Sequence, residues 1–238
     1  MQRSTSEHAA EIQQHGFSVL NSVIDQDVVV RTIEQLQATL AKSSSAITGK
    51  SGKLAAARNI LSELPSANRL WQQPRLTQLL TDVLGEEFVC VRALYFDKHP
   101  ENTWSLPWHK DMTIAIKDNS IASEGFSKPT TKSGVPHLEA STDVLDNMLT
   151  LRIHLDEVTE ENGPLEVVPG SNHSGKTPAT ESNVKTVFAA PGDVLAMRPL
   201  ISHKSSSSHS GTTKHRRILH FEFSGDPVLP NGLAWYYV

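Results

Sequence analysis

The sequence of 238 residues contains two short triplets in which a histidine stands two positions before an aspartate, His109-Lys110-Asp111 and His154-Leu155-Asp156. On an extended strand, residues i and i+2 point to the same face, so both side chains of such a triplet can reach one ion. Two imidazoles and one carboxylate on one face of a metal are typical of non-haem iron sites, which keep positions open for substrate and oxygen. The chain has eleven histidines but a single cysteine, Cys90, so any metal site is expected to use histidine and carboxylate ligands.

The surroundings of the two triplets favour the first one. His109 precedes a long polar stretch, 118–145, which we interpret as a mobile loop that acts as a lid. The third ligand has to come from one of the last strands, where His203 follows a turn and an apolar strand. More strands fit between His109 and His203 than between His154 and His203, and a closed barrel needs the larger number of strands. We therefore predict that His109, Asp111 and His203 bind a metal ion, and keep only His154 as a further candidate for the cavity lining.

The overall composition limits the classes of protein and partner. The chain carries 22 lysines and arginines against 26 aspartates and glutamates, for a net charge of −4 and a pI of about 6.2. This balance gives no reason to expect nucleic acid or a membrane surface as a partner. With 38% hydrophobic residues, the composition is that of a folded globular protein. We see neither a signal peptide nor an apolar run of about 18 residues, and expect a cytoplasmic protein that acts on a small molecule.

Helical patterns dominate the first third of the chain. Apolar residues recur at helical spacing over 28–40 and 75–84, and Gly85 closes the second of these helices. A short strand is expected at 16–20. The stretch 43–53, rich in serine, glycine and lysine, is expected to be a surface loop.

From about residue 88 onward the apolar period changes to two, which is typical of strands. We expect strands at 88–96, 112–116, 149–155, 165–168, 186–189, 194–198 and 217–223. Turn-forming residues such as Pro169-Gly170-Ser171 and Pro191-Gly192-Asp193 separate several of them. Many short strands divided by turns in this way predict an antiparallel sandwich or barrel.

The simplest organisation is one domain, 1–238, that is mainly β. A helical part at 1–86 supports a core at 87–224, and a C-terminal tail follows at 225–238. The tail contains the aromatic run Trp235-Tyr236-Tyr237.

Several motifs resemble those of the phytanoyl-CoA dioxygenase family of iron(II)- and 2-oxoglutarate-dependent oxygenases. They are Trp108-His109-Lys110-Asp111, Glu161-Asn162-Gly163-Pro164-Leu165, Val168-Pro169-Gly170-Ser171, His203-Lys204-Ser205 and Arg216-Arg217. The resemblance extends from about residue 10 to residue 224, and the occurrence of all the motifs in order makes it specific. It implies a double-stranded β-helix core, also called a jelly roll or cupin-like core, with Fe(II), 2-oxoglutarate as co-substrate and O2.

The resemblance also implies an arginine that holds the distal carboxylate of 2-oxoglutarate. A guanidinium suits this task because its planar fork pairs with both oxygens. The family's spacing to a following aromatic residue assigns the role to Arg216, seven residues before Phe223. The separation from His203 is longer than usual in the family, so Arg217 stays an alternative. Strand alternation favours Arg216, which shares a face with polar Glu222, whereas Arg217 shares one with apolar Phe223.

Four further residues occupy or lie near family positions that contact the co-substrate: Ser205, Arg152, Arg58 and Leu94. Ser205 follows His203 by two positions, but it is also one of four consecutive serines. Arg152 shares a strand face with other polar residues, and this face is either a cavity lining or a solvated outer surface. Arg58 lies near a basic family position, and Leu94 either packs on the co-substrate or belongs to the core.

Three functions are compatible with such a site. The resemblance implies an oxygenase that hydroxylates, or otherwise oxidises, an unactivated carbon of a small molecule and releases succinate and CO2. A non-catalytic cupin-like binding module would use its metal structurally, which normally requires a fourth protein ligand. A cupin hydrolase or isomerase with zinc or manganese would leave Arg216 without a reason to face the metal. The substrate is left open, because one fold hosts many substrates.

Overall fold

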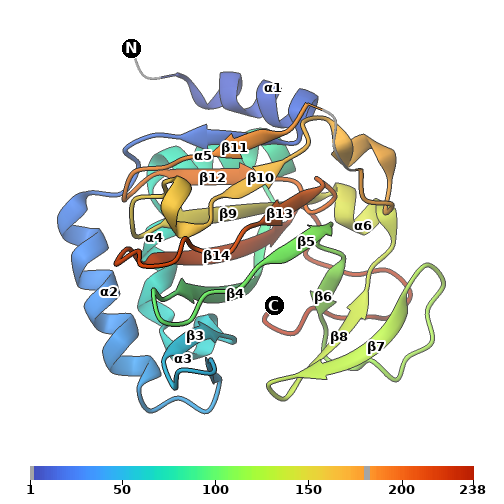
Figure 1. Cartoon of the computed structure of the whole chain (residues 1–238). Coiled ribbons are helices and arrows are strands. Elements are labelled where there is room, and N and C mark those ends of the chain that lie inside the picture. Colours follow the sequence, from blue (N-terminus) through green and yellow to red (C-terminus); the bar gives the residue numbers. More distant parts are fainter. Residues whose placement is uncertain (1–2, 180–182) are drawn as a thin grey trace.

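The computed structural model of the protein describes residues 3–179 and 183–238, and its largest element is a seven-stranded antiparallel sheet (Figure 1). In spatial order its strands are β1 (Phe17–Leu20), β12 (Val194–Met197), β9 (Met148–His154), β14 (Arg216–Ser224), β4 (Val89–Lys98), β3 (Leu54–Ala57) and β2 (Ala46–Thr48). Strands from the beginning, middle and end of the chain thus lie side by side, which brings distant parts of the sequence to one surface.

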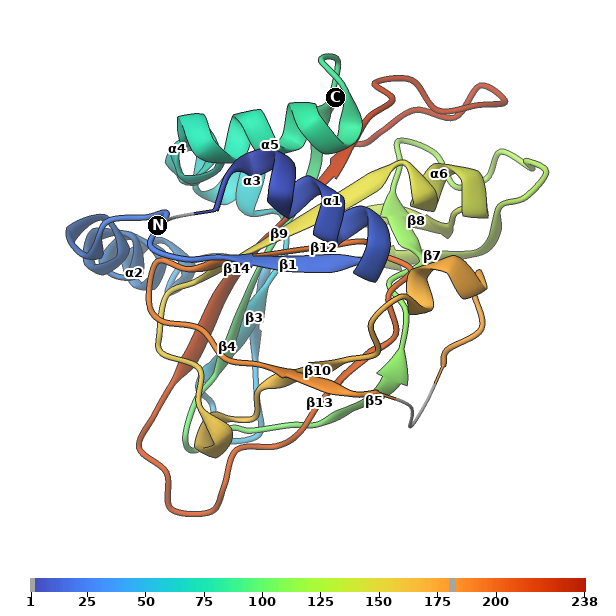
Figure 2. The ribbon, with the colours of Figure 1, turned by 90° about the horizontal axis from the view of Figure 1, so that it is seen from above.

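A second sheet lies opposite the large one (Figure 2). Its strands, in spatial order, are β11 (Lys185–Val187), β10 (Leu165–Val167), β13 (His203–Ser205) and β5 (Leu106–His109). Buried residues of β10, such as Leu165 and Val167, pack against Leu195 and Met197 of the large sheet. Two facing antiparallel sheets of this kind form a jelly roll, so the predicted mainly β, cupin-like fold is confirmed.

The two faces of the large sheet have opposite character because side chains alternate along each strand. On one face, Ile153 of β9 and Leu219, Phe221 and Phe223 of β14 are fully buried in the main hydrophobic core, together with residues of the helices. The residues between them face the second sheet, and many of these are polar. In this way the core fixes the strands whose other face forms the site.

Helices cover the apolar face of the large sheet (Figure 2). The α-helices are α1 (Thr5–His15), α2 (Gln26–Leu40), α3 (Ile60–Glu63), α4 (Asn68–Trp71), α5 (Pro74–Leu84) and α6 (Thr142–Asp146), and short 3₁₀ turns span Pro65–Ala67, Glu160–Asn162 and Ser171–Ser174. Helices α2 and α5 match the two helices expected from apolar spacing. Helix α1 was not expected, and it begins at a reciprocal capping box in which Ser4 and Glu7 each bond the other's backbone N–H.

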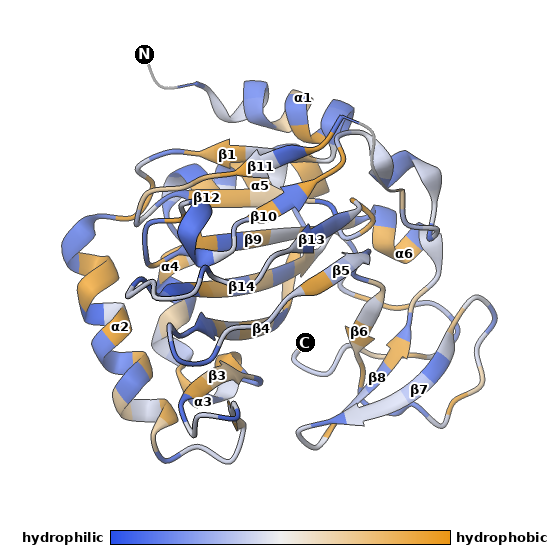
Figure 3. Cartoon of the chain, viewed as in Figure 1, coloured by the Kyte–Doolittle hydropathy of each residue, from blue (hydrophilic) through white to orange (hydrophobic). Residues whose placement is uncertain are grey.

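Two expected loops contain strands instead. The stretch 118–145 was predicted to be a mobile lid, but it forms β7 (Ser127–Lys132) and β8 (Val135–Glu139), which join β6 (Thr113–Ala115) in a third sheet. The prediction failed because β7 is polar (Figure 3) and its first five residues are all exposed. Its sequence therefore shows no alternation of apolar and polar residues. Likewise, β2 lies within the stretch 43–53, where it is the short, largely exposed edge strand of the large sheet and pairs with β3.

The C-terminal tail packs against the third sheet. Trp235, which is 1% exposed, bridges to Ile116, and the backbone N–H of Tyr236 donates to the carbonyl oxygen of Ala115 at 3.2 Å. The tail thereby reaches the region between the third sheet and strand β3 of the large sheet (Figure 1), where the Tyr237 hydroxyl bonds Asn59. Within the described residues, no helix is long and apolar enough to cross a membrane.

Candidate metal centre and its cavity

The three predicted ligands come together on two neighbouring strands of the second sheet. His109 is the last residue of β5, and the register of the β5–β13 pair sets it directly opposite His203. Asp111 lies two residues further on, where its backbone N–H donates to the carbonyl oxygen of Pro199 at 2.9 Å. His109 Nε2 is 3.9 Å from Asp111 Oδ1, and His203 Nε2 is 3.6 Å from Asp111 Oδ2.

The donor atoms of this triad fit a single metal ion. Both distances are below the roughly 4.2 Å that can separate two atoms bound to one ion at about 2.1 Å each. His109 Nδ1 donates to the Pro107 carbonyl oxygen at 2.7 Å, and His203 Nδ1 donates to that of Ile201 at 3.0 Å. These bonds place the proton on Nδ1 and leave each Nε2 lone pair available to a metal. Among the described residues, the cluster that could hold a metal ion consists of these two imidazoles and one carboxylate. This donor set is typical of non-haem iron(II).

Charge and burial keep these groups in the protonation state that a metal needs. Burial acts to raise the pKa of Asp111, but the neighbouring histidines, His203 foremost, outweigh it and hold this pKa at about 2. Burial lowers the pKa of His203 to about 4, against a smaller opposing effect of Asp111. At neutral pH the carboxylate is therefore ionised and the His203 imidazole is neutral, and both states bind metal.

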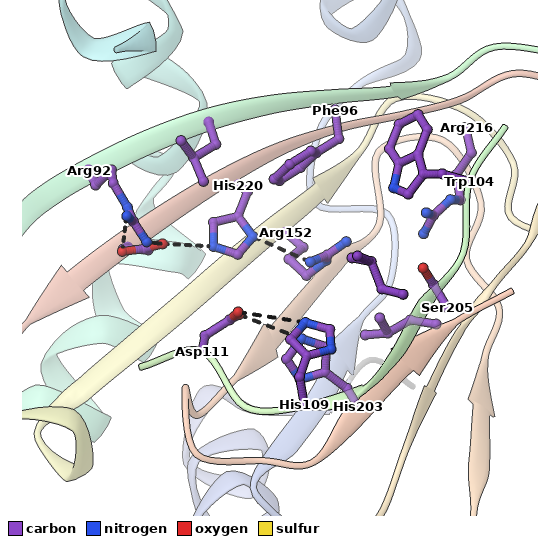
Figure 4. Close-up of a pocket in the computed structure, with 14 residues that line it drawn as sticks. Arg92, Phe96, Trp104, His109, Asp111, Arg152, His203, Ser205, Arg216 and His220 are labelled. Carbon is purple, nitrogen blue, oxygen red and sulfur yellow. Dashed lines mark hydrogen bonds and ion pairs between the residues drawn. The ribbon is translucent and has the colours of Figure 1, made fainter. Parts of the chain in front are cut away.

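The triad opens on a cavity between the two large sheets (Figure 4). The residues that line it are Arg92, Leu94, Phe96, Trp104, Leu106, His109, Asp111, Arg152, Leu165, His203, Ser205, Arg216, His220 and Glu222. Arg216 lies at one end and Arg92 at the other, with His220 and Asp111 between them (Figure 4). We call these two regions the Arg216 end and the Arg92 end.

At the Arg216 end, two arginines are buried and form no ion pair with a carboxylate of the described residues. Arg216 and Arg152 are 4% and 8% exposed, and in both the Nε atom is buried and has no hydrogen-bond partner among the described residues. Burial, and then the charge of Arg152, lowers the pKa of Arg216 to about 9. A buried cation without a counter-charge is unfavourable by itself, so this end is suited to receive an anion.

Lys98 is a third basic side chain at the Arg216 end. It stands opposite Arg216 in the β4–β14 register and is fully buried. Its Nζ donates to Ser205 Oγ at 3.2 Å and to the carbonyl oxygens of Gly163, at 3.4 Å, and Ser206. Burial first, and the charge of Arg216 second, lowers the pKa of Lys98 to about 6. Sequence analysis missed this residue, because only the strand register reveals that it neighbours Arg216.

At the Arg92 end, by contrast, the arginine is paired. Arg92 Nε donates to Glu222 Oε2 at 2.9 Å, and its Nη2 donates to Oε1. Glu222 Oε1 also lies 3.1 Å from His220 Nε2, and His220 Nδ1 lies 3.3 Å from Arg152 Nη1. Because arginine only donates, His220 Nδ1 accepts and its Nε2 donates to Glu222. A continuous chain of hydrogen bonds therefore links the two ends of the cavity (Figure 4).

The sequence of the chain matches one family over most of its length. Residues 12–217 match the family of phytanoyl-CoA dioxygenase (PhyH). The chain belongs to this family of iron(II)- and 2-oxoglutarate-dependent oxygenases. The resemblance noted from the motifs is thereby confirmed. A curated relative, L-proline trans-4-hydroxylase from Streptomyces griseoviridis, is 29% identical over 107 residues. That match spans 45% of this chain and only 32% of the relative's length.

Solved structures share the fold of this family member. EctD from S. alaskensis with bound Fe aligns with a TM-score of 0.71 at 19% identity, over 94% of this chain and 78% of that chain. The non-haem α-ketoglutarate-dependent epimerase SnoN from nogalamycin biosynthesis aligns with a TM-score of 0.65 at 17% identity, over 92% of this chain and 82% of that chain. At such identities the likeness is one of fold.

Of the residues predicted to contact the co-substrate, four line the cavity and one does not. Leu94, Arg152, Ser205 and Arg216 face it, so the alternative of a solvated outer surface for Arg152 is wrong. Arg58 is not among the lining residues. It lies on the Arg92 side, where burial first and the charge of Arg92 second lower its pKa.

The alternative residues of the sequence analysis lie elsewhere. Arg217 points to the opposite face of β14, where its Nε and Nη2 donate to the two oxygens of Asp156 at 2.8 and 2.6 Å. Asp156 is therefore engaged by Arg217 and is not part of the metal cluster. His154 faces the interior but is not among the lining residues. Both of its ring nitrogens are buried without a partner among the described residues, and burial lowers its pKa to about 3.

Proposed function

We propose that this chain is an iron(II)- and 2-oxoglutarate-dependent oxygenase that hydroxylates a carbon of a small molecule. The observation that carries the proposal is the position of the His109, Asp111 and His203 triad beside two buried arginines, Arg152 and Arg216, whose Nε atoms have no hydrogen-bond partner among the described residues. A metal triad alone suits several cupin chemistries. An anionic co-substrate bound next to the metal explains why Arg152 and Arg216 face the same cavity unpaired.

The relatives support a small molecule as substrate. The curated relative is named for the hydroxylation of L-proline. One EctD structure contains 2-oxoglutarate and 5-hydroxyectoine, and one SnoN structure contains Fe3+, α-ketoglutarate and nogalamycin RO. These molecules differ widely from one another, so they support a reaction class rather than one substrate.

The triad residues and the metal have separate tasks in the reaction. His109, Asp111 and His203 would hold the ion, with the backbone carbonyls that bond each Nδ1 fixing the orientation of the rings. When bound, iron(II) supplies the redox chemistry by which O2 and 2-oxoglutarate oxidise a carbon–hydrogen bond.

The Arg216 end would hold the co-substrate. Arg216 pairs with the distal carboxylate of 2-oxoglutarate, and Ser205 donates a hydrogen bond to the same carboxylate. Arg152 adds a second positive charge, and Leu94 packs against the carbon chain. Because these groups are buried before the co-substrate arrives, its carboxylate meets donors that are already in place.

Apolar side chains enclose the part of the cavity next to the triad. Phe96, Trp104, Leu106 and Leu165 line it together with the metal-binding residues. Their role is to exclude water from the reacting carbon, so that the substrate is oxidised and side reactions with water are prevented.

The direct test is succinate release by the iron(II)-loaded protein supplied with 2-oxoglutarate and O2. We expect slow release without any substrate and none from Asp111→Ala, because that variant loses a charged metal ligand. A second readout is the melting temperature, which iron(II) should raise in the natural chain but not in Asp111→Ala.

Asp156→Asn is the matched control, because Asp156 belongs to the other His-x-Asp triplet and bonds Arg217. This variant should lose some stability and keep succinate release. The proposal would be wrong if the natural chain neither released succinate nor bound 2-oxoglutarate, or if Asp111→Ala kept full turnover.

A further inference from the structure

A second group of basic residues gathers around the Arg92 end of the cavity. It comprises Arg58, just after β3, Lys132 at the end of β7 and His137 in β8, and together with Arg92 we call these residues the Arg92 cluster. Ala57 pairs with Tyr95 in the β3–β4 register, so Arg58, the next residue, lies beside the cavity-lining Leu94 of β4. Burial first, and then nearby positive charges that include Arg92, lower the pKa of Arg58, Lys132 and His137. The carboxylates of Glu222 and Asp111 have smaller, opposing effects on the pKa of Lys132.

Hydrogen bonds hold the segments of this cluster together. Asn59 Nδ2 donates to the carbonyl oxygen of Ser133 at 3.2 Å, so the segments that carry Arg58 and Lys132 lie next to each other. Tyr237 in the C-terminal tail donates from its hydroxyl to Asn59 Oδ1 at 2.8 Å. The hairpin that carries Lys132 turns sharply because Ser133 has φ 49° and the next residue, a glycine, has φ 76°. Three segments far apart in the sequence thus lie close together, the end of β3, the β7–β8 hairpin and the C-terminal tail (Figure 1).

The Arg92 cluster carries more positive charge than the protein neutralises. Glu222 already bonds Arg92 and His220. Within the described residues, no ion pair involves Arg58 or Lys132, although both side chains are partly buried. Iron(II) and 2-oxoglutarate have opposite charges of equal size, so their binding leaves this surplus in place. The surplus favours an anionic molecule as the remaining occupant of the site.

His137 adds an unused hydrogen-bond acceptor to the same region. The residue is 2% exposed, and its Nδ1 lies 2.8 Å from the carbonyl oxygen of Val135. That bond places the ring proton on Nδ1, so Nε2 is an acceptor, and it is buried without a partner among the described residues. Burial, and then the charge of Arg92, lowers the pKa of His137 to about 4, which keeps the ring neutral at neutral pH.

We propose that the substrate is a small carboxylic acid, whose carboxylate binds Arg58 and Lys132 and whose nearby N–H or O–H group donates to His137 Nε2. The proposal deepens the function proposed above and rests on it. With its carboxylate held at the Arg92 end, the substrate extends toward Asp111, and the carbon to be oxidised lies beyond the carboxylate. Arg92 itself donates its hydrogen bonds to Glu222, so it contributes positive charge near the substrate carboxylate but does not contact it directly.

The first experiment compares matched acids and amides on the natural chain. The iron(II)-loaded enzyme with 2-oxoglutarate is given a panel of common L-amino acids and small cyclic carboxylic acids, each beside its primary amide, and phosphate monoesters form a further arm. Succinate release above the substrate-free rate is measured, together with the melting temperature of the Mn(II)- and 2-oxoglutarate-loaded protein. We expect at least one acid to stimulate release and raise the melting temperature, and its amide to do neither.

Two variants then test the residues. Arg58→Gln and Lys132→Gln should each raise the KM for the acid by about tenfold or more, and the preference for acid over amide should shrink. Lys128→Gln is the matched control. Lys128 lies on the same strand, but its Nζ pairs with Glu139 at 2.7 Å and its side chain is 71% exposed. This variant should keep both the KM and the preference.

The outcomes separate this inference from the proposed function. If substrate-free succinate release is measurable but amides act as well as acids, or only phosphate esters act, or no acid acts, the carboxylate assignment is overturned. If Arg58→Gln raises the KM for 2-oxoglutarate rather than for the acid, Arg58 belongs to the co-substrate site and not to the Arg92 cluster. If succinate release is absent altogether, the proposed function fails, and binding of acids in the melting assay still reports on the cluster.

Discussion

At the Arg216 end of the cavity two arginines lie buried without a carboxylate partner, whereas at the Arg92 end the buried arginine is held by both oxygens of Glu222. Both ends belong to the same face of the same sheet, since Arg216 and Glu222 lie on one strand. The unpaired cations around the Arg92 end, Arg58 and Lys132, are only partly buried. The two ends thus differ in how much unneutralised charge is buried before any ligand arrives.

This difference is suited to two kinds of ligand, a co-substrate that is always the same and a substrate that enters and leaves. A co-substrate that is the same in every reaction cycle can bind to fixed, buried cations. Burying these cations is unfavourable in the protein without ligand, and binding of the anionic co-substrate offsets that free energy. A substrate that must enter and leave is better served by cations near the surface, whose charge is screened and whose side chains can adjust. The Glu222 pair keeps Arg92 in place without adding another unpaired charge.

The largest effect is expected from removing the fixed cation at the Arg216 end. Arg216→Gln should raise the KM for 2-oxoglutarate by about 100-fold, because a charged, paired hydrogen bond contributes about 1.5–3 kcal/mol and its loss also leaves the carboxylate poorly neutralised. The measurement is the rate of succinate release against 2-oxoglutarate concentration. Saturation near the natural KM in this variant would contradict the assignment.

Arg217→Gln is the control, because it alters the adjacent residue of the same strand on the opposite face. Arg217 and Asp156 form an ion pair with side chains 15% and 17% exposed. Breaking it should lower the free energy of unfolding by about 1–3 kcal/mol and leave the KM for 2-oxoglutarate nearly unchanged. If instead Arg217→Gln raised this KM as much as Arg216→Gln does, the difference between the two faces would not matter for binding.

Strand alternation explains why this pair of arginines could be distinguished from the sequence. Leu219, Phe221 and Phe223 alternate along the strand and lie in the core with the helices, so the face that Arg216 shares with Glu222 was expected to be the polar one. The triad was found from the sequence for a related reason, because His109 and Asp111 are close in sequence and share a face. His203 was predicted because it follows a turn and an apolar strand and lies far enough from His109 to leave room for the intervening strands.

Residues whose roles depend on pairing between distant strands were missed. Lys98 is indistinguishable from a surface lysine until β4 is placed against β14. The stretch 118–145 looked like a loop because the polar strand β7 has no apolar period, and only its pairing with β8 makes it a strand. Such features follow from tertiary contacts, which local patterns do not contain.

A moderate effect is expected from breaking the connection between the two ends. His220 accepts from Arg152 at 3.3 Å and donates to Glu222 at 3.1 Å, so it positions one cation at each end. His220→Ala should raise the KM for 2-oxoglutarate and for the acid by about tenfold each, with a smaller change in kcat. His220→Gln can restore an acceptor and a donor and should recover most of both KM values. An equal loss in both variants would point to packing against Phe96 rather than to the hydrogen bonds.

The smallest effect concerns the stability of the metal-free protein at the Arg216 end. His154 is 2% exposed, and burial, with Arg152 and Arg216 next, lowers its pKa to about 3. An unfolded histidine titrates near 6.5, so between these two values the unfolded chain binds a proton that the folded chain does not. Stability should therefore fall as the pH is lowered from about 6.5 toward 3, by at most about 1.4 kcal/mol per pH unit from this residue.

His154→Leu removes the titrating group and puts an apolar side chain of similar size in the buried position. Urea unfolding at pH 7, 6 and 5 should show a weaker loss of stability on acidification for the variant than for the natural chain. A residual loss is expected, because His203 is also buried and its pKa is lowered to about 4. Identical pH profiles for the two proteins would mean that the folded protein accepts a proton on His154 as readily as the unfolded chain does. In that case the Arg216 end would be less dehydrated than its unpaired arginines indicate, and the contrast between the two ends would weaken.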